Sequence, residues 1–95
     1  MSDVKVIKQN PRVVFRELGA DAGAVLLHLG TSAYFKLNET GVMIYKLTEE
    51  GVSLQQLCES VRHRLEDAPS DIESDIEGFV EALAERDLVI VEHHG

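Results

Sequence analysis

Few side chains in this sequence could support nucleophilic or metal chemistry. They are one cysteine, Cys58, and four histidines, His28, His63, His93 and His94. A cysteine becomes a nucleophile when a neighbouring group stabilises its thiolate, and zinc needs three or four converging thiolate, imidazole or carboxylate ligands. Neither His28 nor His63 has a cysteine or a second histidine at ligand spacing, and the adjacent His93 and His94 have poor chelating geometry. We therefore expect no metal site.

Cys58 falls on the apolar stripe of a predicted helix. The stripe repeats at the spacing of one helical face and consists of Leu54, Leu57, Cys58, Val61 and Leu65. Free cysteine on such a stripe is usually a small core residue. The sequence also contains no GxGxxG and no P-loop motif. We therefore expect neither catalysis nor a cofactor, and a small enzyme is the weakest of the functional alternatives.

The size and charge of the chain limit its partners. It has 95 residues, which fits a single domain over residues 1–95, and a formal net charge of −8. Residues 1–37 carry +2 and residues 38–95 carry −10. An acidic surface repels phosphate, so we expect no binding to nucleic acid or to an anionic membrane. The first residues, MSDVKVIKQNP, have no apolar region typical of a signal peptide, and no apolar run approaches membrane-spanning length, so we expect a cytoplasmic protein.

Three segments have the composition of β-strands and are separated by short turns. They are VVFREL (residues 13–18), AVLLHL (24–29) and AYFKL (33–37). This pattern predicts a three-stranded antiparallel meander with edges at its first and third strands. The middle segment is almost wholly apolar, which predicts a strand that is covered on both faces. The late segment LVIVE (residues 88–92) is compatible with either a short final strand or an extended tail.

Helical patterns follow the third strand. Asn38 predicts the start of a short helix, Ser53 with Gln56 forms a capping box for a second, and Ser70 with Glu73 predicts the cap of a third. The third helix has an apolar face composed of Ile72, Ile76, Phe79, Val80 and Leu83. The sequence therefore predicts an α+β fold, with a three-stranded antiparallel β-sheet followed by three α-helices.

The order of the helices is also that of a winged-helix regulator. Its third helix would be the recognition helix, but the segment SDIESDIEGFVEALAERD carries seven acidic residues and one arginine. Recognition helices approach phosphates and need basic side chains. DNA binding is therefore disfavoured, and a regulator that binds a protein through this helix is a second hypothesis.

An open edge strand beside an apolar helix predicts peptide binding. In β-augmentation, a peptide pairs with the edge as an added strand and places side chains into neighbouring pockets. We expect the peptide to pair antiparallel with Ala33, Tyr34, Phe35, Lys36 and Leu37, and the third helix to supply its pocket from Asp75, Ile76, Phe79, Val80 and Leu83. Phe79 and Val80 are adjacent, so only one of them can lie at the rim. For Ile76 and Leu83 we favour a position in the core over one in the pocket. For the Asp75 side chain we favour exposure to solvent over a contact with a basic peptide residue.

Three segments together resemble the PqqD-like family of peptide-recognition elements. They are VVFRELGADAGAVLLHLGTSAYFKLNETGVMIYKL, GVSLQQLCESVRHRL and DIESDIEGFVEALAERDLV. The resemblance covers about residues 11–91 and is carried by the order and spacing of soft patterns, most of all GAVLLHL and YFKLNETG. It implies a winged helix-turn-helix fold.

The resemblance also implies a function. Such modules bind the leader of a ribosomally synthesised precursor peptide between the third strand and the third helix, and they present it to a maturation enzyme. The LNETG junction and the acidic helix are more similar to the lasso-peptide leader-binding subunits, which act with a leader peptidase. The alternative within the family is a pyrroloquinoline quinone type of peptide chaperone that delivers its precursor to a radical maturase.

Overall fold

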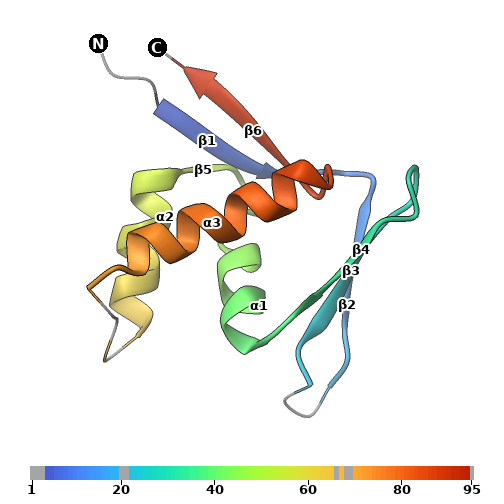
Figure 1. The fold of residues 1–95 in the computed structure, drawn as a ribbon, viewed down its shortest axis with the longest axis horizontal. Coiled ribbons are helices and arrows are strands. Elements are labelled where there is room, and N and C mark those ends of the chain that lie inside the picture. The colour runs from blue at the N-terminus through green and yellow to red at the C-terminus, as the bar shows by residue number, and fades with distance from the viewer. Residues whose placement is uncertain (1–3, 20–21, 66, 68–69, 95) are drawn as a thin grey trace.

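The chain forms two small antiparallel sheets and three helices, as seen in a computed structural model (Figure 1). The structure describes residues 4–19, 22–65, 67 and 70–94. In chain order the elements are β1 (Val4–Gln9), β2 (Val13–Glu17), β3 (Ala24–His28), β4 (Tyr34–Leu37), α1 (Glu39–Lys46), β5 (Val52–Ser53), α2 (Leu54–Arg64), α3 (Ile72–Glu85) and β6 (Val89–His94). The predicted α+β class is therefore confirmed.

The predicted meander is present as the sheet β2–β3–β4, with β2 and β4 at its edges. Leu26 lies opposite both Phe15 of β2 and Phe35 of β4, which fixes the register of all three strands. Because side chains alternate along a strand, these three residues share one face of the sheet. That face lies against the helices, and Leu26 is fully buried there.

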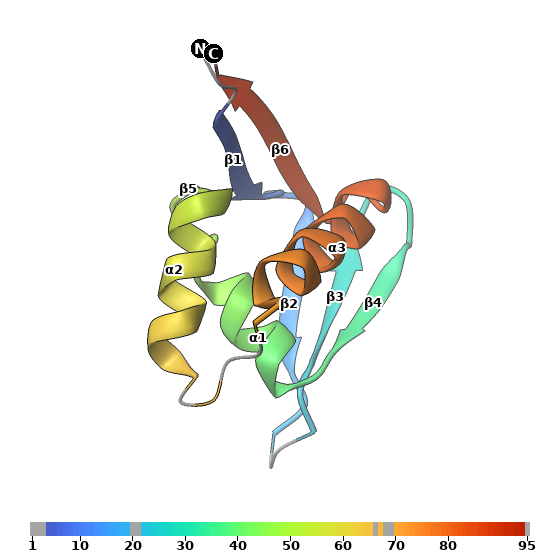
Figure 2. The ribbon, with the colours of Figure 1, turned by 60° about the vertical axis from the view of Figure 1, so that its left-hand side comes forward.

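The prediction that the middle strand is covered on both faces is wrong. Leu27 of β3 remains 41% exposed on the outer face of this sheet. Its cross-strand neighbours, Val14 of β2 and Tyr34 of β4, are 42% and 68% exposed, so one row of three apolar or aromatic side chains crosses the outer face. All three helices lie on the opposite side of the sheet (Figure 2). The apolar composition of a strand does not reveal that helices pack against only one face of its sheet.

A second sheet was not predicted from the sequence. Its order is β5–β1–β6, and β1 pairs with β6 along its whole length, from Val4 opposite His94 to Gln9 opposite Val89. The segment LVIVE was compatible with either a strand or an extended tail. It forms most of β6, so the strand alternative is correct. A faint signal existed in VKVIKQ, where three of the six residues are β-branched. Figure 1 shows the β1–β6 pair projecting away from the helices.

Two of the three predicted helix caps are confirmed. The Asn38 side chain accepts a hydrogen bond from the Gly41 backbone N–H at 2.8 Å, and Ser53 and Gln56 form the reciprocal capping box of α2. The prediction for Ser70 is wrong, because α3 begins at Ile72 and its N-cap residue, Asp71, makes no side-chain capping bond. Ile72 is 5% exposed, so its burial in the core fixes the start of this helix. The sequence also predicts turns at GADAG (residues 19–23) and EDAPS (residues 66–70), and parts of both lie outside the described residues.

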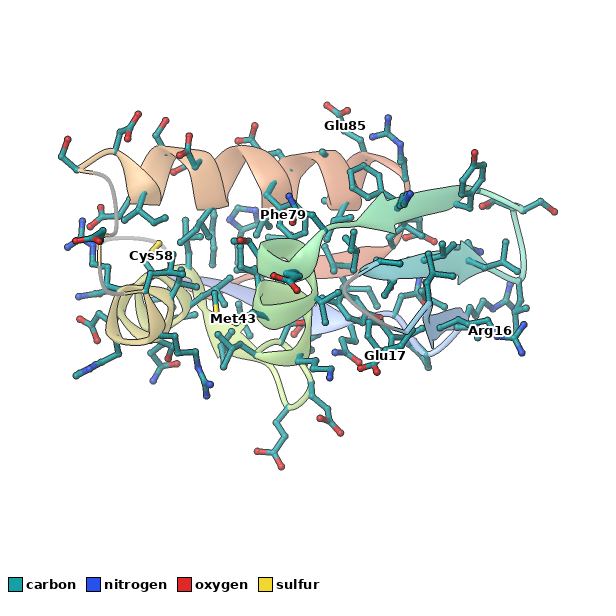
Figure 3. All side chains as sticks on the ribbon, turned by 90° about the horizontal axis from the view of Figure 1, so that it is seen from below. Arg16, Glu17, Met43, Cys58, Phe79 and Glu85 are labelled. Carbon is teal, nitrogen blue, oxygen red and sulfur yellow. The ribbon has the colours of Figure 1, made fainter. Side chains whose placement is uncertain are left out.

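Helix α3 lies between the two sheets and joins their cores. Ile76 and Leu83 are each 1% exposed and belong to the core, as the apolar pattern predicts. Val80 is also buried, whereas Phe79 is only half-buried. α3 therefore presents Phe79 at the side of the helix that faces β4 (Figure 3).

Candidate functional site

A groove of about 1150 Å³ lies between β4, the start of α1 and the N-terminal half of α3. A typical small-molecule pocket has a volume of roughly 300–1,000 Å³, so this groove has room for a larger ligand. Its lining consists of Ala22, Phe35, Lys36, Leu37, Asn38, Glu39, Thr40, Gly41, Ile44, Ile72, Asp75, Ile76 and Phe79. More of the lining surface is apolar than polar. The groove therefore suits a ligand with both apolar side chains and a polar backbone.

One end of the groove is built on an aromatic pair. The rings of Phe35 on β4 and Phe79 on α3 meet edge to face, with their centroids 6.3 Å apart. The Arg86 guanidinium lies over the Phe35 ring, 5.2 Å from its centroid. A hydrogen bond from Arg86 Nη1 to the Ala82 carbonyl oxygen, at 3.0 Å, holds the arginine in place. These contacts fix the distance between strand and helix at this end.

The free edge of β4 supplies unpaired backbone groups. His28 donates its backbone N–H to the Ala33 carbonyl oxygen at 2.8 Å, and these residues lie opposite each other in the β3–β4 register. Hydrogen-bonded and non-hydrogen-bonded pairs alternate along an antiparallel ladder. The next hydrogen-bonded residues of β4 are therefore Phe35 and Leu37. Tyr34 and Lys36 direct their N–H and C=O groups outward, along the groove.

The other end of the groove is acidic. Glu39 begins α1 and Asp75 lies in the first turn of α3, and both side chains are exposed. Within the described part of the chain, neither carboxylate forms an ion pair. The Asn38 cap fixes the direction in which α1 leaves β4, and this direction carries Glu39 to the groove. The rim at this end is therefore suited to bind a positively charged group.

The structure brings together six of the ten predicted site residues. Phe35, Lys36, Leu37, Asp75, Ile76 and Phe79 all line the groove. Ala33 and Tyr34 continue the same strand beyond it, and Ala33 precedes the first residue of β4. Val80 and Leu83 do not line the groove, since both are buried in the core. Of the adjacent pair, Phe79 is therefore the residue at the rim.

Sequence reasoning missed the contribution of the β4–α1 junction. Asn38, Glu39, Thr40 and Gly41 follow the strand directly and form one wall of the groove. The capping signal at Asn38 showed that the chain turns there, but it did not show that the turn faces α3. Arg86 was also missed, because its contact with Phe35 joins residues that are far apart in the sequence.

His28 has a structural role in this fold. Its Nδ1 atom accepts hydrogen bonds from the backbone N–H groups of Gly30 and Thr31, and its Nε2 atom lies 2.9 Å from Asp87 Oδ2. These bonds require the tautomer that carries its proton on Nε2. Asn10 donates to the same carboxylate, so the network ties the β3–β4 turn to the end of α3. No group of three or more possible metal ligands occurs among the described residues, and His94 lacks a described side chain.

Cys58 lies away from the groove, beside a hollow formed by β1, α2 and α3. Cys58 is 6% exposed, and burial raises the pKa of its thiol. The carboxylates of Glu73 and Glu77 raise this pKa further, and the Arg62 guanidinium partly opposes them. The thiol therefore stays protonated at neutral pH and is a poor nucleophile.

We expect Cys58→Ala to lower the free energy of unfolding by only about 1 kcal/mol, the order expected for a small cavity. Urea denaturation followed by circular dichroism measures this change. Peptide binding should be unaffected, because Cys58 does not line the groove. Rapid alkylation of the native thiol at neutral pH would contradict the assignment of Cys58 to the core.

Comparisons with known proteins identify the chain's relatives. The family Coenzyme PQQ synthesis protein D (PqqD) matches residues 23–89. A solved structure of TbiB1 in complex with the TbiA(beta) leader peptide is 32% identical, with a TM-score of 0.71, over 86% of this chain and 93% of that one. A lasso peptide synthetase B1 complexed with its leader peptide is 25% identical, also with a TM-score of 0.71, over 88% of this chain and 96% of that one.

No curated protein sequence matches the chain significantly. Among the described residues, no helix has the length and apolar character needed to cross a membrane. The matched residues include β3, β4, all three helices and every groove residue except Ala22, and both solved relatives were determined with a leader peptide bound. This protein is a member of the PqqD family and has the fold of the lasso-peptide B1 proteins.

Proposed function

We propose that this protein binds the leader of a ribosomally synthesised precursor peptide, by adding it as a strand to β4, and has no catalytic activity of its own. The observation that carries the proposal is the open edge at Tyr34 and Lys36 beside an apolar groove. A peptide there would satisfy the outward backbone groups and place alternate side chains against Phe79 and Ile76. The leader complexes of both solved relatives support this assignment.

The lasso-peptide pathway is the favoured context, and the maturation enzyme is then a leader peptidase. This choice rests on the two B1 relatives, while the family description points to the quinone-cofactor alternative. While β4 holds the leader by its edge, the outer face of the sheet, with Val14, Leu27 and Tyr34, stays accessible to an enzyme. We also propose that the helices form a winged helix-turn-helix arrangement and that the protein is cytoplasmic.

A winged-helix regulator is less well supported by the structure. The solvent-facing side of α3 carries Asp71, Glu73, Glu77 and Glu81 around Gly78. Phosphates would meet four carboxylates on this face, of which Glu73 is paired with Arg62. The helix that a regulator would insert into DNA therefore repels it, and we propose no nucleic-acid or membrane partner.

Selection of peptides tests the proposed function. Random 12-residue peptides displayed on phage are selected on the full chain, and the enriched peptides are synthesised for calorimetry. We expect Phe79→Ala to weaken their binding about 30-fold, because truncating an aromatic interface anchor costs about 2 kcal/mol or more. Glu81→Ala is the matched control, since Glu81 lies on α3 outside the groove and should leave affinity unchanged.

Two further readouts separate binding from folding. Circular dichroism shows whether Phe79→Ala retains its helices, because its ring also packs against the core. Amide exchange should show that the backbone N–H groups of Tyr34 and Lys36 become protected when peptide is added. The proposal would be wrong if no peptide is enriched, or if folded Phe79→Ala binds with full affinity.

A further inference from the structure

The groove is charged oppositely at its two ends. Glu39 and Asp75 line the end where β4 meets α1, and Arg86 lies just beyond the lining at the other end, stacked over Phe35. The two ends are kept apart because β4 and α3 run in opposite directions. The hydrogen bond between His28 and Asp87 holds the end of α3 at the β3–β4 turn, so its first turn, with Asp75, reaches the β4–α1 junction.

Neighbouring charges do not cancel this polarity. Glu85 precedes Arg86 in the chain but points from α3 away from the strands (Figure 3). Lys36 alternates with Phe35 and Leu37, so its side chain projects on the outer face of the sheet, although other atoms of the residue line the groove. Arg86 forms no ion pair with any described residue. Two carboxylates at one end and one guanidinium at the other therefore have no opposite charge paired with them among the described residues.

An added strand would meet these ends in a defined order. A peptide antiparallel to β4 has its N-terminal side at Leu37 and its C-terminal side at Tyr34. The basic side chain of the peptide would therefore lie on the N-terminal side of the apolar anchors for Phe79 and Ile76, and the acidic side chain on their C-terminal side.

We propose that the bound peptide has a charge polarity matched to the groove, with a lysine or arginine before its apolar anchors and an aspartate or glutamate after them. This proposal rests on the proposed function, and it adds the chemistry of the residues that flank the apolar anchors of the peptide. Exposed ion pairs are individually weak, so the polarity selects direction and register while the aromatic anchor supplies most of the affinity.

The displayed 12-residue peptides test the proposal directly. Those enriched on the unmodified chain should carry basic residues on the N-terminal side of their apolar core and acidic residues on the C-terminal side. A synthetic enriched peptide should bind several-fold to about tenfold more tightly than the isomer in which its basic and acidic residues are exchanged. Raising the salt concentration to 1 M should remove most of this difference.

Charge reversal in the protein provides the matched experiment. Glu39→Lys with Asp75→Lys should favour the exchanged isomer, because its N-terminal side is acidic. Arg86→Glu should also favour this isomer, because its C-terminal side is basic. Glu49→Lys with Glu50→Lys changes the charge by the same amount as the double reversal, at exposed positions outside the groove, and should leave the preference unchanged. Asp75→Asn, which adds no new charge, provides a milder variant if the double reversal unfolds.

The outcomes separate the two proposals. If no peptide is enriched, the proposed function fails. If peptides are enriched and protect Tyr34 and Lys36 but show no polarity, or keep their polarity on the reversed variants, then the function stands and the charge proposal is overturned.

Discussion

Gly23→Ala should lower the free energy of unfolding by more than about 3 kcal/mol, because it combines backbone strain with a clash against main chain. Gly23 adopts φ +82, which L side chains rarely adopt, and a Cβ there would lie 1.9 Å from the Leu37 carbonyl oxygen. The clash cannot be relieved by a side-chain rotation, since the opposing atom belongs to the backbone of β4. Urea denaturation followed by circular dichroism measures the loss.

Gly19→Ala is the matched control for this substitution. Gly19 has a similar φ of +74, but a Cβ there would have no atom of the described residues within 4 Å, apart from its neighbours in the chain. It should cost only the left-handed strain, about 1–2 kcal/mol. The difference between the two variants then isolates the close approach of Gly23 to β4. Equal losses in the two variants would show that this approach does not stabilise the fold.

Lys36→Pro should weaken peptide binding at least about 30-fold, a loss of about 2 kcal/mol. The Lys36 N–H points outward, so the proline ring removes a donor to the peptide without breaking a bond to β3. The peptide carbonyl that loses this donor is left unsatisfied in the interface, which adds to the cost. Calorimetry with an enriched peptide measures the change, and circular dichroism should show intact helices.

Lys36→Ala separates the backbone effect from the side-chain effect. It keeps the N–H group and removes only a side chain on the outer face, so affinity should stay within about twofold, as expected for an exposed position. Tyr34→Pro offers a second outward position and should behave like Lys36→Pro. If Lys36→Ala weakens binding as much as proline does, the peptide does not pair with the edge of β4.

Local patterns in the sequence determined the elements around the groove. Alternating and apolar runs marked β2, β3 and β4, and the side-chain chemistry of Asn38 and Ser53 marked the starts of α1 and α2. These features depend on neighbours within a few residues. The acidic character of α3 was also evident from the sequence, because charged side chains can be counted without a structure.

Tertiary structure alone decided which of these residues meet. The pairing of β1 with β6 joins the two ends of the described chain, and the Phe35–Phe79–Arg86 cluster joins a strand to a distant helix. The apolar pattern of α3 did not separate Phe79, at the groove, from Val80, in the core, because both are apolar and adjacent. The direction in which α3 crosses the sheet determines which of these two side chains faces the groove. That direction is set by packing contacts between residues that are far apart in the sequence.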